Sequence, residues 1–299
     1  MKFLKPFFTV IAFITLFIHE SYAQDLQDST IYSIETNDGN EYIGRIISRD
    51  GDKITLLTDK LGEIKIFTRY ITSIKEISET SFKEGSYWFE NPQATRYFWA
   101  PNGYGLKKGE AYYQNVWIFF NQVSVGITDN FSLGAGMVPA FIFAGSPTPV
   151  WVTPKFSIPV VEDNFNVGLG ALAGAVIGES GATFGILYGS TTFGSKDKNL
   201  SVGLGYGFAG GEWANGPALN VSGMLRTGPR GYLLTENYYI GFDDDKLALL
   251  SFGGRRIIKK ISLDFGGIIP ITTDIPFIVI PWLGITVPIG KKDNYKKSN

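Results

Sequence analysis

A repeat of two residues constrains the fold of this chain more than any other feature. Between residues 87 and 290, apolar residues alternate with glycine, serine and other small or polar residues. The alternation is clearest in five segments, at residues 131–137, 165–175, 200–208, 261–266 and 283–289. Successive side chains of a β-strand point to opposite faces, so this period predicts strands with one apolar face. We therefore expect an all-β fold.

Composition decides which face of these strands meets solvent. Residues 87–290 hold 27 charged residues among 204, and 31 of the 36 glycines in the chain. A soluble sandwich also alternates, but its outer face carries lysine and glutamate rather than glycine and serine. The segments run for about 9–13 residues, the length that a tilted strand needs to cross a bilayer. The pattern predicts a transmembrane antiparallel β-barrel with its apolar face toward lipid.

The number of strands follows from the segments and the connections between them. Single-chain bacterial barrels have an even number of strands. Eleven strands are expected at residues 113–128, 131–143, 150–160, 165–177, 182–193, 200–209, 217–226, 231–241, 246–256, 261–269 and 277–289. A further strand at residues 87–100, before these, makes twelve. Ten and fourteen strands are the alternatives. Tight connections at residues 129–130 and 162–164 alternate with longer ones at residues 144–149 and 210–216. Short turns are typical of the periplasmic side, so both ends of the barrel are expected there.

The first 23 residues have the pattern of a cleaved export signal. Two lysines lie in residues 1–5, an apolar run follows at residues 7–18, and Ser21 and Ala23 offer small residues before Gln24. The alternative, a membrane-anchoring helix, needs about 20 apolar residues. We expect a mature chain that begins at Gln24, an outer-membrane location, and a periplasmic N-terminal domain.

Residues 24–86 differ in composition from the barrel region, with 20 charged residues among 63. Short alternating segments, split by turns such as Asp38-Gly39, predict about five strands. Asp38-Gly39, Gly44, Asp50 and Ile54-x-Leu56 resemble the first motif of Sm-like small barrels. The resemblance implies a small Sm-like or SH3-like β domain, with residues 31–77 available to a periplasmic partner. The Ile-Arg-Gly motif that Sm-like proteins carry second is missing, so no nucleic-acid partner is expected.

The last strand and the start of the barrel region carry two further resemblances. Trp282, Gly284, Val287 and Ile289 resemble the assembly signal of bacterial outer-membrane proteins, which implies the outer-membrane insertion machinery as a partner. Residues 96–101 and 104–113 make the region similar to uncharacterised Gram-negative outer-membrane barrel proteins that pair a small periplasmic β domain with a barrel. That resemblance implies no defined activity. Residues 291–299 are expected to form a polar tail.

The residues that are missing from the chain exclude several chemistries. It has no cysteine, and its single histidine, His19, lies in the export signal. The mature chain therefore lacks the residues that serine–histidine and cysteine–histidine catalysis require. It also lacks the thiolate and imidazole ligands of common metal sites. We expect no cofactor, no metal site and no enzymatic activity. The net charge of −1 provides no field for attracting nucleic acid.

Five charged residues of the predicted barrel strands are candidates for lining the lumen. The strand period places Lys155, Arg226, Arg255 and Asp264 on the small or polar face, while the period around Glu236 is ambiguous. A charge toward lipid is costly, so we expect these residues to line the lumen. They either set the ion selectivity of a pore or pair and plug the lumen. The leading hypothesis is a narrow pore or a transporter for small solutes; the alternative is a closed barrel that anchors a periplasmic interaction domain.

The export signal generates the first testable prediction. The protein recovered from the outer membrane of a Gram-negative host is expected to begin at Gln24, as measured by intact-mass spectrometry. Ala23→Arg places a large charged residue before the cut and should leave the full chain uncleaved, whereas Tyr22→Phe should be processed normally. An uncleaved parent chain would contradict the prediction.

Overall fold

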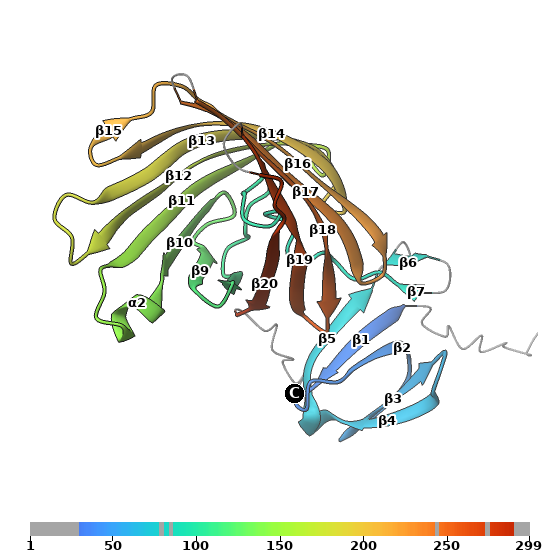
Figure 1. The fold of residues 1–299 in the computed structure, drawn as a ribbon. Helices are drawn as coiled ribbons and strands as arrows, with labels where there is room; N and C mark the ends of the chain where they lie inside the picture. The colour runs from blue at the N-terminus through green and yellow to red at the C-terminus, as the bar shows by residue number, and fades with distance from the viewer. Residues whose placement is uncertain (1–29, 78–80, 84–85, 243–244, 273–275, 290–299) are drawn as a thin grey trace, which may run out of the picture. The chain divides into compact units, whose positions relative to one another are not determined.

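A computed structural model describes residues 30–77, 81–83, 86–242, 245–272 and 276–289. The chain forms two compact units that divide between Thr80 and Ser81, and each is described by itself (Figure 1). The predicted export signal and the predicted polar tail lie outside the described residues.

The first unit is a five-stranded antiparallel sheet with the strand order β4-β3-β2-β1-β5. Its elements are β1 (Ile31–Thr36), β2 (Glu41–Asp50), β3 (Lys53–Thr58), β4 (Gly62–Phe67), the 3-10 turn η1 (Thr68–Tyr70) and β5 (Ile71–Ile77). A core of five buried side chains holds it together: Ile34, Ile54, Leu56, Ile66 and Ile71. The expected number of strands is therefore present.

The turn between β1 and β2 shows how the local sequence sets the register of this sheet. Gly39 has a φ of 77°, a conformation that only glycine adopts without strain. The Thr36 hydroxyl and the Asn40 backbone amide donate hydrogen bonds to Asp38, over 2.6 and 3.3 Å. These bonds hold the pKa of Asp38 below its usual range. The Asp-Gly pair thus makes the predicted hairpin turn.

The second unit contains a closed antiparallel barrel of twelve strands. The strands are β8 (Ala111–Val116), β9 (Phe120–Gly126), β10 (Phe131–Met137), β11 (Thr148–Val161), β12 (Phe165–Ile177), β13 (Thr183–Gly194), β14 (Lys198–Ala209), β16 (Ala218–Gly228), β17 (Gly231–Phe242), β18 (Asp245–Ile258), β19 (Ile261–Ile271) and β20 (Ile280–Pro288). Each strand pairs with its neighbour in the chain, and β20 pairs with β8 to close the barrel, with Gly284 opposite Val116. The predicted all-β class and the closed antiparallel barrel of twelve strands are confirmed.

Two of the predicted strand assignments are wrong, and their errors cancel in the count. Residues 87–100 do not form the first barrel strand. Tyr87 belongs to β7 (Ser86–Tyr87), which pairs with β6 (Phe82–Lys83), and Arg96 forms an isolated bridge with Pro101. Residues 113–128 are two strands, β8 and β9, rather than one. The turn between them puts Trp117 and Ile118 at φ values of 50° and 69°. Such turns usually carry Asn-Gly or Asp-Gly, so two large side chains gave no turn signal.

The connections divide the barrel into two distinct ends. At one end, which we call the turn end, the connections are short: residues 127–130, 162–164, 195–197, 229–230 and 259–260. At the other, the loop end, they include residues 138–147 with the helix α2 (Pro139–Phe143), and residues 210–217 with β15 (Glu212–Trp213). Because the number of strands is even, β8 begins and β20 ends at the turn end. None of the helices in the described ranges is long and apolar enough to cross a membrane.

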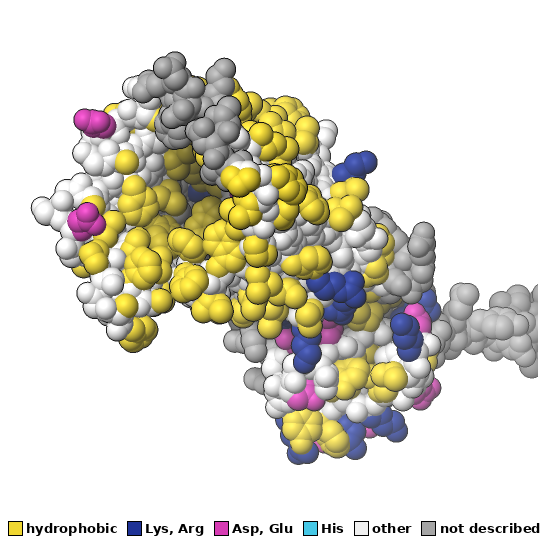
Figure 2. Space-filling model, in the orientation of Figure 1, with side chains coloured by type: hydrophobic (Ala, Val, Ile, Leu, Met, Phe, Trp, Pro, Cys, Tyr) yellow, Lys and Arg dark blue, Asp and Glu magenta, His cyan; other side chains and the backbone are white. Residues whose placement is uncertain are grey.

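The two faces of the barrel reverse the burial pattern of a soluble protein. Large apolar side chains such as Leu204 and Phe252 point outward and are 55% and 62% exposed. Small polar side chains such as Ser222 and Ser262 point inward and are fully buried. Hydrophobic side chains accordingly spread over much of the barrel in Figure 2. The barrel therefore has an apolar outside and a polar inside.

Candidate functional site

The lumen of the barrel is occupied by the chain itself. Residues 88–110, which we call the inner segment, run inside the barrel before β8 begins. The Tyr97 hydroxyl donates to Asn199 of β14 over 2.7 Å, and the Tyr104 hydroxyl donates to the Gly194 carbonyl of β13 over 2.6 Å. Tyr97 is fully buried. The inner segment is thus anchored to the barrel wall.

The glycines of the region allow this close approach. A Cβ added at Gly103 of the inner segment would lie 2.5 Å from the Asn166 carbonyl oxygen on β12. A Cβ at Gly126 on β9 would lie 2.1 Å from the Lys107 carbonyl oxygen. Real Cβ atoms do not come so near to backbone atoms. Gly103 on the inner segment and Gly126 on the wall must therefore both be glycine for the two parts of the chain to pack this closely.

A buried charge cluster fixes the centre of the inner segment. Asp264 on β19 lies opposite Arg255 on β18 and accepts from its Nε and Nη2 over 2.6 and 2.9 Å. Arg96 of the inner segment donates from Nη1 to the same carboxylate over 2.9 Å. Arg255 also donates to the backbone carbonyls of Gln93 and Tyr97, over 2.6 and 2.7 Å. All three charged side chains are at most 2% exposed, so one carboxylate joins two strands to the inner segment.

Glu236 on β17 binds the next part of the inner segment. Its Oε2 accepts hydrogen bonds from the backbone amides of Trp99 and Ala100, over 2.8 and 2.9 Å. Its Oε1 accepts from the Tyr238 hydroxyl over 2.8 Å. The residue whose strand period was ambiguous therefore points inward and is buried.

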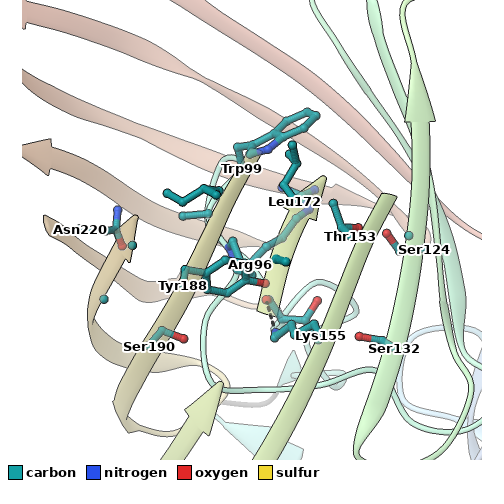
Figure 3. Close-up of a pocket in the computed structure, with 18 of the residues that line it drawn as sticks. Arg96, Trp99, Ser124, Ser132, Thr153, Lys155, Leu172, Tyr188, Ser190 and Asn220 are labelled. Atoms are coloured by element: carbon teal, nitrogen blue, oxygen red, sulfur yellow. Dashed lines mark hydrogen bonds between the residues drawn. The ribbon is translucent and has the colours of Figure 1, made fainter. Parts of the chain in front are cut away.

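Lys155 on β11 binds the inner segment from another side of the barrel. Its Nζ donates to the backbone carbonyls of Tyr104 and, over 3.4 Å, of Thr95. Figure 3 shows Lys155 among the side chains that line the space beside the inner segment. Lys155 is 7% exposed, and no ion pair joins it to a carboxylate in the described part of the chain.

Arg226 on β16 binds the start of the inner segment. Its Nη1 donates to the Phe89 carbonyl and to the Asp197 carboxylate, each over 2.9 Å. Its Nη2 donates to the Pro229 carbonyl over 2.7 Å. All five charged residues predicted to face the lumen are thus placed inward, and each takes part in the contacts that hold residues 88–110.

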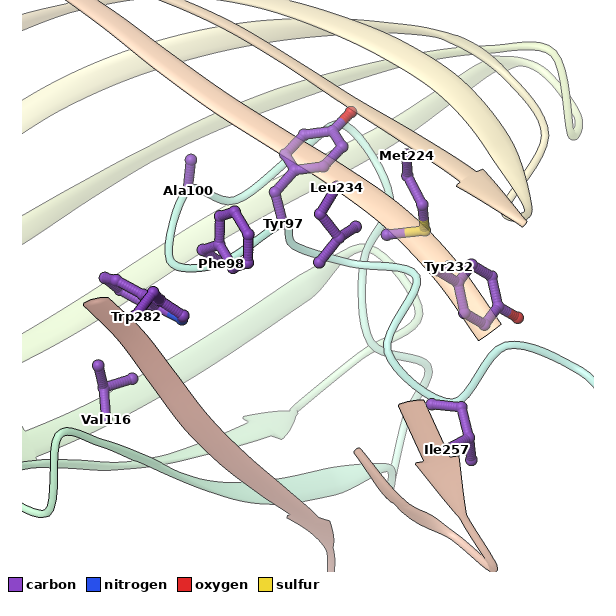
Figure 4. Close-up of a cluster of buried hydrophobic side chains, with 9 residues drawn as sticks. All are labelled: Tyr97, Phe98, Ala100, Val116, Met224, Tyr232, Leu234, Ile257 and Trp282. Carbon is purple, nitrogen blue, oxygen red and sulfur yellow. The ribbon is translucent and has the colours of Figure 1, made fainter. Parts of the chain in front are cut away.

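An apolar cluster inside the barrel completes the packing around the inner segment (Figure 4). Its buried members come from the inner segment and from five strands: Tyr97, Phe98, Ala100, Val116, Met224, Tyr232, Leu234, Ile257 and Trp282. The Phe98 and Trp282 rings lie 5.5 Å apart, and the Trp282 and Trp117 rings lie 4.9 Å apart. The lumen thus holds a small hydrophobic core as well as charges.

The residues predicted as an assembly signal occupy the closing strand. Trp282 packs inward in the apolar cluster, and Gly284 sits at the β20–β8 seam. Val287 pairs with Tyr113, and the Ile289 amide donates to the Ala111 carbonyl over 2.8 Å. The four residues therefore form the seam of the barrel, and their recognition by insertion machinery stays a prediction.

Arg96 is the central residue that the sequence did not reveal. The strand predicted at residues 87–100 includes Arg96, although the run Arg96-Tyr97-Phe98-Trp99 has no alternation of apolar and polar residues. The lack of alternation and the turn-forming pair Asn91-Pro92 both indicate that this stretch is not a strand. The described residues contain no group of three or more histidine, cysteine, aspartate or glutamate side chains that could hold a metal ion.

A cavity of about 250 Å³ remains between the inner segment and the wall formed by β8–β14, β16 and β17. The inner segment contributes Arg96 and Trp99, and the wall contributes Lys155, Leu172 and Tyr188 among others (Figure 3).

Comparison with known proteins adds no family assignment. No protein-family model matches the chain, and neither curated proteins nor solved structures give a match.

The charge cluster generates a prediction about stability. Asp264→Ala leaves two buried guanidinium groups without their carboxylate, and losing one partner of a buried pair costs about 3–5 kcal/mol. The urea midpoint of the refolded protein in detergent is expected to fall strongly. Glu90→Gln, which breaks an exposed pair with Lys196, is the matched control and should leave the midpoint nearly unchanged. Equal midpoints for Asp264→Ala and the parent would contradict the assigned role of the cluster.

Proposed function

We propose that this chain is a non-enzymatic outer-membrane β-barrel protein whose lumen is sealed by its own inner segment, and that the barrel anchors the domain of residues 31–77 in the periplasm. One observation carries the proposal: the inward charges bind residues 88–110 instead of lining an open channel. Of the two functions that the sequence left open, this favours the closed barrel over the narrow pore.

The reversed burial pattern supports a membrane location. Exposed leucine and phenylalanine side chains over serine, glycine and buried charges suit a barrel in lipid and would be unfavourable in water. Most barrel strands have 9–14 residues, which is enough to cross a bilayer when tilted. All five connections at the turn end have two to four residues, whereas four of the six at the loop end have five or more. This difference resembles that between the periplasmic and external sides of bacterial barrels.

The hydrogen bonding of the charged residues supports a sealed lumen. Charges that select ions in a pore face water and leave groups available to a passing ion. Here Glu236 accepts three hydrogen bonds, and Arg255 donates to two backbone carbonyls and one carboxylate. Removing the inner segment would leave several buried charged groups without partners, so the segment stabilises the barrel as well as filling it.

The periplasmic role follows from chain direction. Barrel strand β8 begins at the turn end, the end that we assign to the periplasm, and the charged N-terminal domain precedes it in the chain. A domain on the periplasmic side is available to a periplasmic partner, and the insertion machinery that assembles such barrels is the expected partner of β20.

Planar-bilayer recording tests whether the lumen is sealed. The mature protein is expected to give no discrete conductance steps, although a gel shift between unheated and boiled samples shows that the barrel has formed. A variant lacking residues 88–109 that keeps the gel shift is expected to conduct, because the sealing segment is gone. Discrete steps from the folded parent protein would overturn the sealed barrel and restore the pore hypothesis.

Cysteine labelling tests the membrane orientation, because the natural chain has no cysteine to interfere. A membrane-impermeant maleimide is expected to label Glu212→Cys, at the loop end, on intact cells. Glu162→Cys, in a short connection at the turn end, should be labelled only after the outer membrane is permeabilised. Both side chains are exposed, so access alone separates the two variants. The reverse pattern would invert the orientation, and no labelling of either on lysed cells would contradict surface exposure.

A further inference from the structure

The cavity beside the inner segment combines apolar walls with buried polar groups. Its volume of about 250 Å³ corresponds to roughly eight waters at about 30 Å³ each. Leu172, Ile186 and Ala218 of the wall and Trp99 of the inner segment provide apolar surface. Figure 3 shows Trp99 and Leu172 together on one side of the group and Lys155, Ser190 and Ser132 on the other.

Two polar groups that line the cavity have no hydrogen-bond partner among the described residues. They are Arg96 Nε and Ser190 Oγ. Arg96 is 2% exposed and Ser190 is 6% exposed. A buried donor without an acceptor costs free energy comparable to a lost hydrogen bond. Both atoms are closed off from the cavity, so an acceptor that enters it can reach them only after the side chains shift.

Lys155 adds a buried amine without a carboxylate partner to the same space. Its amine reaches only two backbone carbonyls, and the nearby Arg96 and Arg255 already share the single carboxylate of Asp264. The buried interior has four basic side chains, and Arg226 pairs with Asp197. The remaining three, Lys155, Arg96 and Arg255, face the two buried carboxylates Asp264 and Glu236. A buried charge without a partner is unfavourable, so the interior favours one additional negative charge.

We infer that this cavity binds a small monocarboxylate with an apolar chain. The carboxylate would accept hydrogen bonds from Lys155 and, once their side chains shift, from Arg96 Nε and Ser190 Oγ, and the apolar chain would lie against Leu172 and Ile186. One excess positive charge suits a monoanion, and the apolar walls disfavour a small, strongly hydrated ion such as phosphate. The volume suits an acid of about ten non-hydrogen atoms, a size that octanoate has.

This inference goes beyond the proposed function and does not depend on it. It requires only the inner segment and the wall around the cavity, so it can hold or fail whichever way the bilayer recordings turn out.

Calorimetric titration of the full mature chain in lipid nanodiscs tests the inference. Octanoate is expected to bind with a stoichiometry of one, and octanol, which has the same chain without the charge, at least about tenfold more weakly. Octyltrimethylammonium and inorganic phosphate are expected not to bind. Equal binding of octanoate and octanol, or binding of phosphate alone, would overturn the inference.

Two variants locate the site. Lys155→Met should weaken octanoate binding by at least about tenfold and have little effect on octanol, with partial recovery in Lys155→Arg. Ala218→Phe fills the cavity and leaves Lys155 and the charge cluster in place, so it tests the site even if Lys155→Met does not fold. Leu219→Phe, at the outward-facing neighbour, is its matched control. Unchanged octanoate binding in Ala218→Phe, with the gel shift retained, would place the ligand elsewhere and overturn the inference.

Discussion

The pairing of buried charges is the constraint on which the rest of the barrel depends. Inside the closed barrel, an arginine or a carboxylate is stable only when charged partners or backbone groups satisfy it. Asp264 alone cannot satisfy both Arg255 and Arg96, and the carbonyls of Gln93, Tyr97 and Phe98 and the Thr286 hydroxyl provide further acceptors. The inner segment and the wall therefore stabilise each other, since neither has a complete set of partners without the other.

The small inward-facing residues of the barrel strands allow the inner segment to pack against the wall. Glycine on the inside of a barrel leaves volume that large side chains would fill, and such volume favours an open lumen. The structure fills most of it with backbone: Gly126 lies against the Lys107 carbonyl, and Gly168 lies against Asn102. Small inward residues here permit close contact between two parts of the chain.

The cavity is the part of the lumen where this filling is incomplete. It lies between the inner segment and strands β8–β14, β16 and β17, next to Lys155, which has no carboxylate partner among the described residues. Unfilled volume, unused donors and excess positive charge thus coincide at one place. A sealed barrel can consequently be a binding protein on one side of its seal and an anchor on the other.

The sequence by itself indicated the all-β class, the alternation of an apolar and a small or polar face, and the inward phase of Lys155, Arg226, Arg255 and Asp264. Those features follow from a period of two, which is a local property of each strand. Only the tertiary structure decided what the inward charges bind. Arg96 meets Asp264 across 168 positions of the chain, and the period of a strand carries no information about such distant partners. The turn at Trp117 and Ile118 was equally hidden, because closure of β8 against β9 and β20 imposes a left-handed backbone on residues that do not favour it.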